Sequence, residues 1–234
     1  MRRERFGLDE EALRAYFPFD RVEEGVFEMA RRLFGVTVTP APEVDVWHPT
    51  VRAYTATAED GTELGTFYTD WFPRESKRGG AWMNGLVHGG PRADGGFDPH
   101  VGVVVGNLTP PHDDAPALLA PDEVRTVFHE YGHLFHQLLT RVPVRARGAS
   151  AVPWDFIEVP SQIFENWTWT AEGVALYARH YRTGAVPIAT YVELQNSYLD
   201  AVEALLDTQS ETLAAGLKVQ QLTGIELNPV EIKP

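Results

Sequence analysis

Residues 128–136 read Phe-His-Glu-Tyr-Gly-His-Leu-Phe-His, with two histidines four positions apart. On a helix His129 and His133 lie on one face about one turn apart, so both imidazoles can bind one tetrahedral zinc ion at about 2.0–2.1 Å. Glu130 projects beside the metal, where it can take a proton from water without being a ligand itself. The spacing therefore predicts a zinc-binding helix with Glu130 as the catalytic base.

The side chains around this motif predict that its helix, expected over residues 122–140, is buried. Apolar residues flank the histidines on most sides of this helix: Val124, Val127, Phe128, Tyr131, Leu134, Phe135 and Leu138. Burial of two histidines and a glutamate without partners is unfavourable, and a metal ion removes that penalty. Gly132 costs about 1 kcal/mol against alanine in mid-helix, which indicates close approach of another backbone or of substrate. The alternative is a chance histidine pair on a surface helix.

A catalytic zinc ion normally has three protein ligands, so one more is expected from a neighbouring helix. Glu158 follows at a distance that lets one helix end and another begin, within residues 154–161 (Trp-Asp-Phe-Ile-Glu-Val-Pro-Ser). Its apolar neighbours make an unpaired carboxylate unfavourable, which favours a ligand over a capping or surface glutamate. Asp155 is expected to cap the second helix, and Glu165 is a candidate to orient one of the histidines.

The chain before the motif combines helices with a small sheet. Helices are expected from Asp9 to Tyr16 and from Asp20 to Phe34, with Gly35 as the C-terminal cap of the second. Three segments have strand character, namely residues 51–58, 63–72 and 101–107. An Asp-Gly turn joins the first two as a hairpin, whereas residues 73–99 are interpreted as a loop.

From Pro121 the pattern is helical almost to the end. The expected helices are 122–140, about 155–182 and 189–221. We therefore predict an α+β, predominantly helical and zincin-like catalytic domain that occupies residues 1–234 as one unit. Its parts are a mixed helix-and-sheet part (7–112), a helical part with the zinc site (121–222) and a tail (223–234).

Composition restricts the partners of the chain. The sequence has 20 Lys and Arg against 33 Asp and Glu, a formal net charge of −13, which disfavours nucleic acid and anionic membranes. No apolar run reaches the roughly 20 residues of a membrane helix, and no signal-peptide stretch follows the basic start. Cysteine is absent, so a metal must be held by His, Asp and Glu. A cytoplasmic location is expected by elimination, and the sequence predicts no oligomeric state.

Several further segments, in the same order, resemble the thimet oligopeptidase family of zinc metallopeptidases, which includes bacterial oligopeptidase A and dipeptidyl carboxypeptidase. The segments are residues 16–22, 46–49, 78–83, 107–111, 122–128, 154–162 and 164–167. The resemblance spans about residues 7–185. It implies that His129, His133 and Glu158 match the family's zinc ligands and Glu130 its catalytic glutamate. It also implies one zinc ion per chain and short oligopeptides as substrates.

The chain departs from this family in two regions. Members of this family have two large lobes around a deep channel. We expect this sequence to lack the N-terminal lobe and a downstream Gly- and Tyr-rich loop with substrate-binding His and Tyr residues, because no segment of it resembles them. We therefore expect either zinc-assisted peptide hydrolysis or a truncated fragment that binds zinc without turnover. A metal-free structural domain is the third hypothesis. Cleavage of internal bonds and release of C-terminal dipeptides both fit the sequence.

Overall fold

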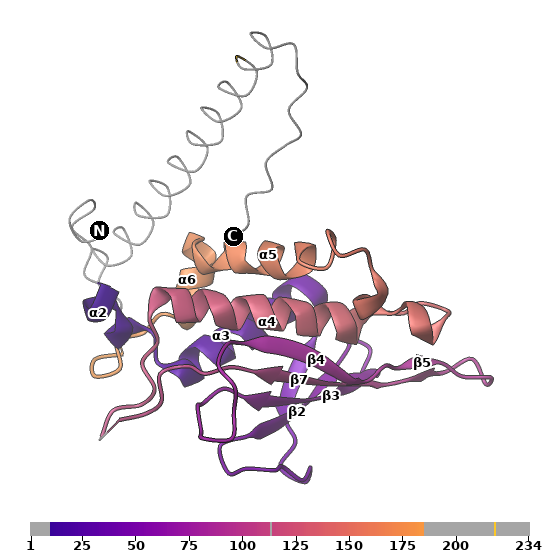
Figure 1. Ribbon diagram of the computed structural model, residues 1–234, viewed down its shortest axis with the longest axis horizontal. Helices are drawn as coiled ribbons and strands as arrows, with labels where there is room; N and C mark the ends of the chain where they lie inside the picture. Colours follow the sequence, from indigo (N-terminus) through magenta and orange to yellow (C-terminus); the bar gives the residue numbers. More distant parts are fainter. Residues whose placement is uncertain (1–9, 113, 185–217, 219–234) are drawn as a thin grey trace.

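Figure 1 shows the computed structural model of the protein, which describes residues 10–112, 114–184 and 218. A five-stranded sheet lies on one side, and helices cover one of its faces (Figure 1). Helices combined with a mixed sheet agree with the predicted α+β class. The helix predicted at 189–221 and the tail at 223–234 lie outside the described residues, apart from Lys218.

The sheet has the strand order β1-β2-β3-β7-β4. These strands are β1 (Thr37–Pro40), β2 (Arg52–Thr57), β3 (Glu63–Asp70), β7 (His100–Val105) and β4 (Trp82–Val87). Strands β3 and β7 are parallel, and the other neighbouring pairs of this sheet are antiparallel. Two short strands form a separate ribbon, β5 (Gly90–Pro91) and β6 (Phe97–Asp98). Strand β4 is thus the last strand at one edge of the sheet.

The helices are arranged in two tiers above this sheet. They are α2 (Glu10–Leu13), η1 (Arg14–Tyr16), α3 (Phe19–Phe34), α4 (Pro121–Leu139), η2 (Arg145–Arg147), η3 (Ala149–Ala151), α5 (Val159–Glu165), η4 (Asn166–Thr168) and α6 (Ala171–Tyr177). Helix α4 packs on β7, β4 and β3, and α5 packs on α4 from the other side (Figure 1). The motif predicted to bind zinc therefore lies on a helix held between a sheet and a second helix.

Helix α4 approaches the sheet closely because a glycine lies beneath it. Leu134 and Leu138 are fully buried on the face of α4 that contacts the sheet. A side chain on Gly102 of β7 would begin 2.8 Å from Leu134 Cδ1, closer than carbon atoms can pack. The small residue and the large one are therefore complementary, and together they fix the height of α4 above the sheet.

The N-terminus of α4 is fixed by one carboxylate. Pro121 begins the helix, and Glu123 accepts a hydrogen bond from the backbone N–H of Ala120 at 2.7 Å. The same side chain accepts hydrogen bonds from Thr109 N at 2.6 Å and from Arg14 Nη1 at 2.7 Å. These bonds satisfy a free N–H group at the helix start and tie α4 to the loop after β7 and to η1.

The buried face of α4 carries a polar group that the protein satisfies completely. Tyr131 OH donates a hydrogen bond of 2.8 Å to Glu23, a buried carboxylate on α3. Tyr54 OH on β2 donates another at 2.8 Å, and Arg52 Nη1 donates a third at 3.0 Å. Buried polar groups normally have such partners, and this network joins α3, β2 and α4 around one carboxyl group.

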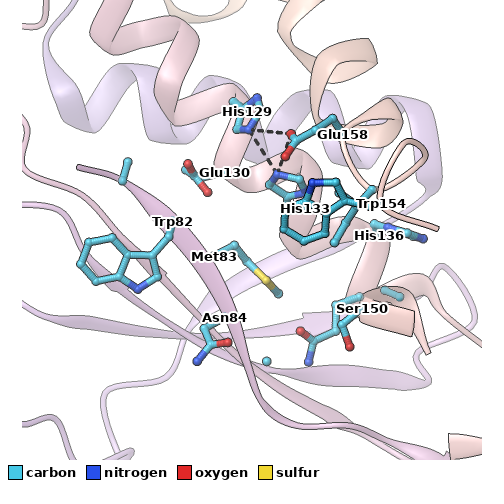
Figure 2. Close-up of a pocket in the computed structure, with 15 residues that line it drawn as sticks. Trp82, Met83, Asn84, His129, Glu130, His133, His136, Ser150, Trp154 and Glu158 are labelled. Carbon is cyan, nitrogen blue, oxygen red and sulfur yellow. Dashed lines mark hydrogen bonds and ion pairs between the residues drawn. The ribbon is translucent and has the colours of Figure 1, made fainter. Parts of the chain in front are cut away.

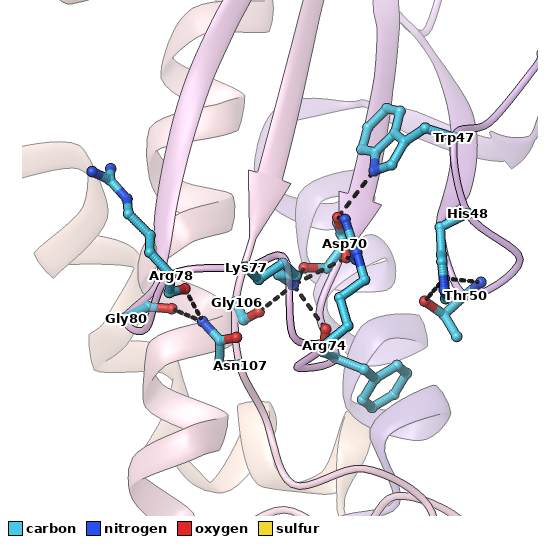
Figure 3. Close-up of polar contacts among 11 residues, drawn as sticks. Trp47, His48, Thr50, Asp70, Arg74, Lys77, Arg78, Gly80, Gly106 and Asn107 are labelled. Atoms are coloured by element: carbon cyan, nitrogen blue, oxygen red, sulfur yellow. Dashed lines mark hydrogen bonds and ion pairs between the residues drawn. The ribbon is translucent and has the colours of Figure 1, made fainter.

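A second polar network holds the segment that leads into β4 (Figure 3). Asp70, at the end of β3, pairs with both terminal nitrogens of Arg74 at 2.7 Å and with Lys77 Nζ at 3.0 Å. Trp47 Nε1 donates to the same carboxylate at 3.1 Å, and Lys77 also donates to the Gly106 carbonyl at 2.6 Å. Burial alone would raise the pKa of Asp70, but these hydrogen bonds outweigh it and lower the pKa to about 2.

Several sequence predictions are confirmed by these elements. The hairpin predicted at 51–58 and 63–72 is formed by β2 and β3, and the strand predicted at 101–107 is β7. The helix expected at 122–140 is α4, and Gly35 caps α3 in the left-handed conformation with a φ of 66°.

Other predictions need correction. Helix α3 begins at Phe19 after Pro18, so Asp20 lies in the first turn and is not the cap. The predicted loop 73–99 contains β4 and the ribbon of β5 and β6. The single helix predicted over 155–182 is instead α5, η4 and α6, because Thr170 starts a new helix by accepting a hydrogen bond from Gly173 N at 3.0 Å.

In the part of the chain that the structure describes, no helix has the length and apolar character needed to cross a membrane.

Candidate metal centre

Three predicted ligand atoms lie together at the outer face of α4 (Figure 2). His129 Nε2 and His133 Nε2 are 3.2 Å apart. Glu158 Oε2 lies 3.2 Å from the first nitrogen and 3.3 Å from the second. Ligand atoms around a tetrahedral zinc ion with bonds of about 2.0–2.1 Å are about 3.3 Å apart, so this triangle fits three corners of one coordination sphere.

The protonation of His129 follows from its second ring nitrogen. His129 Nδ1 lies 2.6 Å from Glu165 Oε1, so this nitrogen carries the proton that the carboxylate accepts. A neutral ring then turns the lone pair of Nε2 toward His133 and Glu158. One proton can bridge only two of these three acceptor atoms, whereas one cation can interact with all of them. The contact predicted for Glu165 is present.

Close packing of α4 and α5 brings Glu158 to the histidines. A Cβ atom on Gly132 would lie 2.6 Å from Ser161 Cα, so glycine allows the two backbones to touch, as predicted. Ser161 Oγ lies 2.8 Å from the Glu158 carbonyl oxygen and 3.0 Å from its Oε2. This hydroxyl, which is fully buried, restricts the rotamers of the Glu158 side chain.

The position of Glu158 differs in one respect from the prediction. Glu158 was expected within a helix capped by Asp155, but it is itself the residue before the first turn of α5. Asp155 lies in the preceding turn, which is closed by a hydrogen bond from Phe156 N to the Pro153 carbonyl at 2.9 Å. A residue at the end of a turn can direct its carboxylate across to α4 without following the helical side-chain direction.

Glu130 lies beside the ligand triangle, in the wall of the same cavity (Figure 2). Only 6% of this residue is exposed. Burial raises the pKa of Glu130 to about 7, and the nearby Glu158 carboxylate adds to the effect against the opposing influence of His129. A positive ion close to this carboxylate would favour its ionised form.

The two histidines differ in their protonation behaviour. Burial disfavours the charged form of His129, but the Glu165 hydrogen bond and the carboxylate of Glu130 outweigh it and raise the pKa. Burial and repulsion by His129 lower the pKa of His133. The pair therefore does not readily hold two positive charges, which suits rings that bind a metal as neutral groups.

A cavity of about 380 Å³ opens in front of these atoms. One wall is the edge strand β4, with Trp82, Met83 and Asn84. The opposite wall is formed by α4, η3 and the turn before α5, which contributes Trp154. The sequence predicted neither β4 nor Trp154 as part of the site, although residues 78–83 and 154–162, which include Trp82 and Trp154, belong to the segments that resemble the thimet oligopeptidase family.

Comparison with known proteins gives the family of the chain. The model of peptidase family M3 matches residues 1–230. The chain belongs to this family. The resemblance stated from the sequence is thereby confirmed.

The relatives of this M3 family member are named as peptidases. The chain is 43% identical to oligopeptidase A of Escherichia coli (strain K12) over 180 residues, 76% of this chain and 26% of that protein. It is 39% identical to dipeptidyl carboxypeptidase of the same organism over 201 residues, 85% of this chain and 29% of that protein. Dipeptidyl carboxypeptidase of Salmonella typhimurium is 36% identical over 237 residues, 97% of this chain and 34% of that protein. The chain thus spans about a quarter to a third of the length of these relatives.

Proposed function

We propose that this chain forms a zincin-like catalytic domain that hydrolyses peptide bonds of oligopeptides with one bound zinc ion. In this proposal His129, His133 and Glu158 bind the metal, and Glu130 is the catalytic base. The observation that carries the proposal is the triangle of ligand atoms with sides of 3.2–3.3 Å. The names of the M3 relatives support oligopeptides as the substrate class.

Each side chain of the site has its own role in the proposed reaction. Zinc supplies a Lewis acid that lowers the pKa of water and polarises the scissile carbonyl. Glu130 takes a proton from the attacking water and passes it to the leaving amine. Glu165 keeps the proton of His129 on Nδ1 and so holds Nε2 ready as a ligand. Ser161 holds the Glu158 carboxylate in its rotamer.

Strand β4 is suited to hold the substrate. It is the edge strand of the sheet and lines the cavity opposite the ligand triangle. The free edge of a strand pairs with an extended peptide by backbone hydrogen bonds, independent of the peptide's sequence. We infer that a substrate lies along β4 with its scissile carbonyl toward the ligand triangle, so that water next to Glu130 can attack the carbonyl carbon.

A second candidate function is zinc binding without turnover. The exposure of the site favours it, because the Glu158 side chain is 48% exposed. An open site admits water, which weakens electrostatic stabilisation of the oxyanion. Loss of an oxyanion donor alone typically lowers the rate by a factor of about 10² to 10³.

The test combines zinc content with cleavage of a quenched fluorescent oligopeptide. Wild type is expected to hold one zinc ion and to cleave the peptide, whereas Glu130→Gln should keep the zinc and lose cleavage. Glu63→Gln, which changes an exposed glutamate on β3, should keep both. Zinc without cleavage in wild type would establish the second function. Cleavage that survives in Glu130→Gln would exclude Glu130 as the base.

A further inference from the structure

Trp154 is the most exposed of the large apolar residues in the described part of the chain. It is 85% exposed, and it lies in the turn that ends at Glu158. Its indole lines the same cavity as the ligand triangle (Figure 2). An exposed tryptophan gains free energy when an apolar group covers it, and such a residue at the wall of a cavity is suited to bind a ligand.

Comparison with Trp47 shows what distinguishes Trp154. Trp47 is 51% exposed, but its Nε1 donates a hydrogen bond to Asp70 and its ring packs 5.1 Å from that of Tyr68. Among the described residues Trp154 has neither a hydrogen bond nor a ring contact of this kind. The indole of Trp47 thus has a structural role, whereas that of Trp154 contributes little to the fold that is described.

Two further apolar residues line the cavity together with Trp154. Ile157, from the same turn, and Met83, from β4, line the cavity with it. Figure 2 shows Trp154 on the side of His133 and His136, away from Trp82. The polar groups proposed for catalysis therefore share their cavity with apolar side chains, and the indole of Trp154 is exposed enough to contact a side chain of a bound peptide.

We propose that Trp154 determines specificity by covering a large apolar side chain of the substrate close to the scissile bond. The proposal rests on the proposed function, because the ligand is the peptide whose bond lies at the metal. The preferred substrates are then oligopeptides with an aromatic or large aliphatic residue at the position that Trp154 covers. Met83 and Ile157 form the rest of this subsite, so Trp154 contributes part of the preference.

Peptide binding tests this subsite without turnover. The parent protein is the zinc-loaded Glu130→Gln chain, and the probes are two labelled pentapeptides, Ala-Ala-Phe-Ala-Ala and all-Ala, followed by fluorescence anisotropy. Differences of one or a few methylene groups in an apolar pocket change affinity about 10- to 200-fold, so we expect the Phe peptide to bind at least about tenfold more tightly. Trp154→Ala should reduce this ratio to about twofold, whereas Trp154→Phe should retain most of it.

Two controls separate this subsite from general effects. Ile163→Ala removes another exposed apolar side chain, 57% exposed and outside the cavity, and should keep the full preference. All variants should hold the same amount of zinc. Equal binding of both peptides to the parent, or a preference that Trp154→Ala leaves unchanged, would overturn the proposal.

Cleavage by the chain with Glu130 intact distinguishes the two proposals. Cleavage without a preference for the Phe peptide would support the proposed function and exclude the subsite. A Trp154-dependent preference in binding, without cleavage, would support the subsite and count against hydrolysis by this chain.

Discussion

The two faces of helix α4 differ in whether other protein groups satisfy their polar side chains. On the buried face, Tyr131 donates a hydrogen bond to Glu23, whose carboxyl group also accepts hydrogen bonds from Arg52 and Tyr54. On the outer face, His129 and His133 turn acceptor nitrogens toward each other and toward a carboxylate. The buried face is complete with protein groups alone. On the outer face the three ligand atoms lie close enough to share one cation, and this difference supports the metal site that we propose.

The largest effect is expected from removing a ligand on the outer face. His133→Ala should lower zinc affinity by roughly 10²- to 10³-fold, because a binding free energy on the order of 10–16 kcal/mol is shared among a few ligands. Peptide cleavage should fall below detection at stoichiometric zinc. Zinc titration with a competing chelator measures the affinity. Unchanged affinity would exclude His133 as a ligand, and the thermal stability of the metal-free protein should change little.

A substitution at Gly132 tests whether the close packing of α4 and α5 positions Glu158, without changing any of the three ligands. In Gly132→Ala the new Cβ would lie 2.6 Å from Ser161 Cα, so α5 must move away from α4 and carry Glu158 with it. We expect zinc affinity to fall about 10- to 100-fold and the free energy of unfolding to fall by about 1–3 kcal/mol. Gly79→Ala is a matched control, because nothing lies within 4 Å of its Cβ. Equal zinc affinity in both variants would contradict the packing argument.

Asp70 is, like Glu23, a carboxylate whose hydrogen-bonding partners are all protein groups. The pKa of Asp70, about 2, lies below the ordinary aspartate value of 3.8, so the stabilisation from this carboxylate is present above about pH 4 and is lost as the pH falls toward 2. Asp70→Asn should lower the free energy of unfolding by about 2 kcal/mol at neutral pH. It should also flatten the dependence of stability on pH between about 4 and 2, which urea titrations at several pH values measure. An unchanged acid profile would show that the network adds no stability.

The smallest effect is expected on the buried face of α4. Tyr131→Phe removes one of the hydrogen bonds to Glu23 and should lower the free energy of unfolding by about 1–2 kcal/mol. Zinc content and affinity should stay as in wild type, since no ligand moves. Chemical denaturation and a zinc titration of the same samples measure both quantities. A loss of zinc larger than the loss of stability would show that the two faces are coupled.

The centre of the site was predictable because its geometry is local. The spacing of His129 and His133 determines their relation on any helix. The prediction of Glu158 assumed that apolar neighbours bury it, whereas its side chain is 48% exposed and Phe156 and Val159 are exposed as well, so the spacing to the next helix is the part of that argument that holds. Gly132 is also a local signal, because glycine in the middle of a helix predicted the close approach of another backbone or of substrate. The Ser161 partner depends on contact between two helices, which no pattern in either helix specifies.

The remaining parts of the fold depend on tertiary contacts or on weak strand signals. Strand β4 contains Asn84 and Gly85, which have low strand propensity, and it forms because β7 offers it an edge. Its place beside α4 follows from the network at Asp70, whose partners are spread from Trp47 to Gly106. In the sequence Trp154 is one apolar residue among several. Its exposure at the cavity wall depends on the tertiary structure.

The most direct test is a crystal structure of the zinc-loaded protein with anomalous scattering measured at the zinc edge. We expect one zinc ion about 2.0–2.1 Å from His129 Nε2 and His133 Nε2, with the Glu158 carboxylate at about 2.0–2.2 Å. A zinc ion bound elsewhere, or bound by the histidines while Glu158 points away, would contradict the proposed centre.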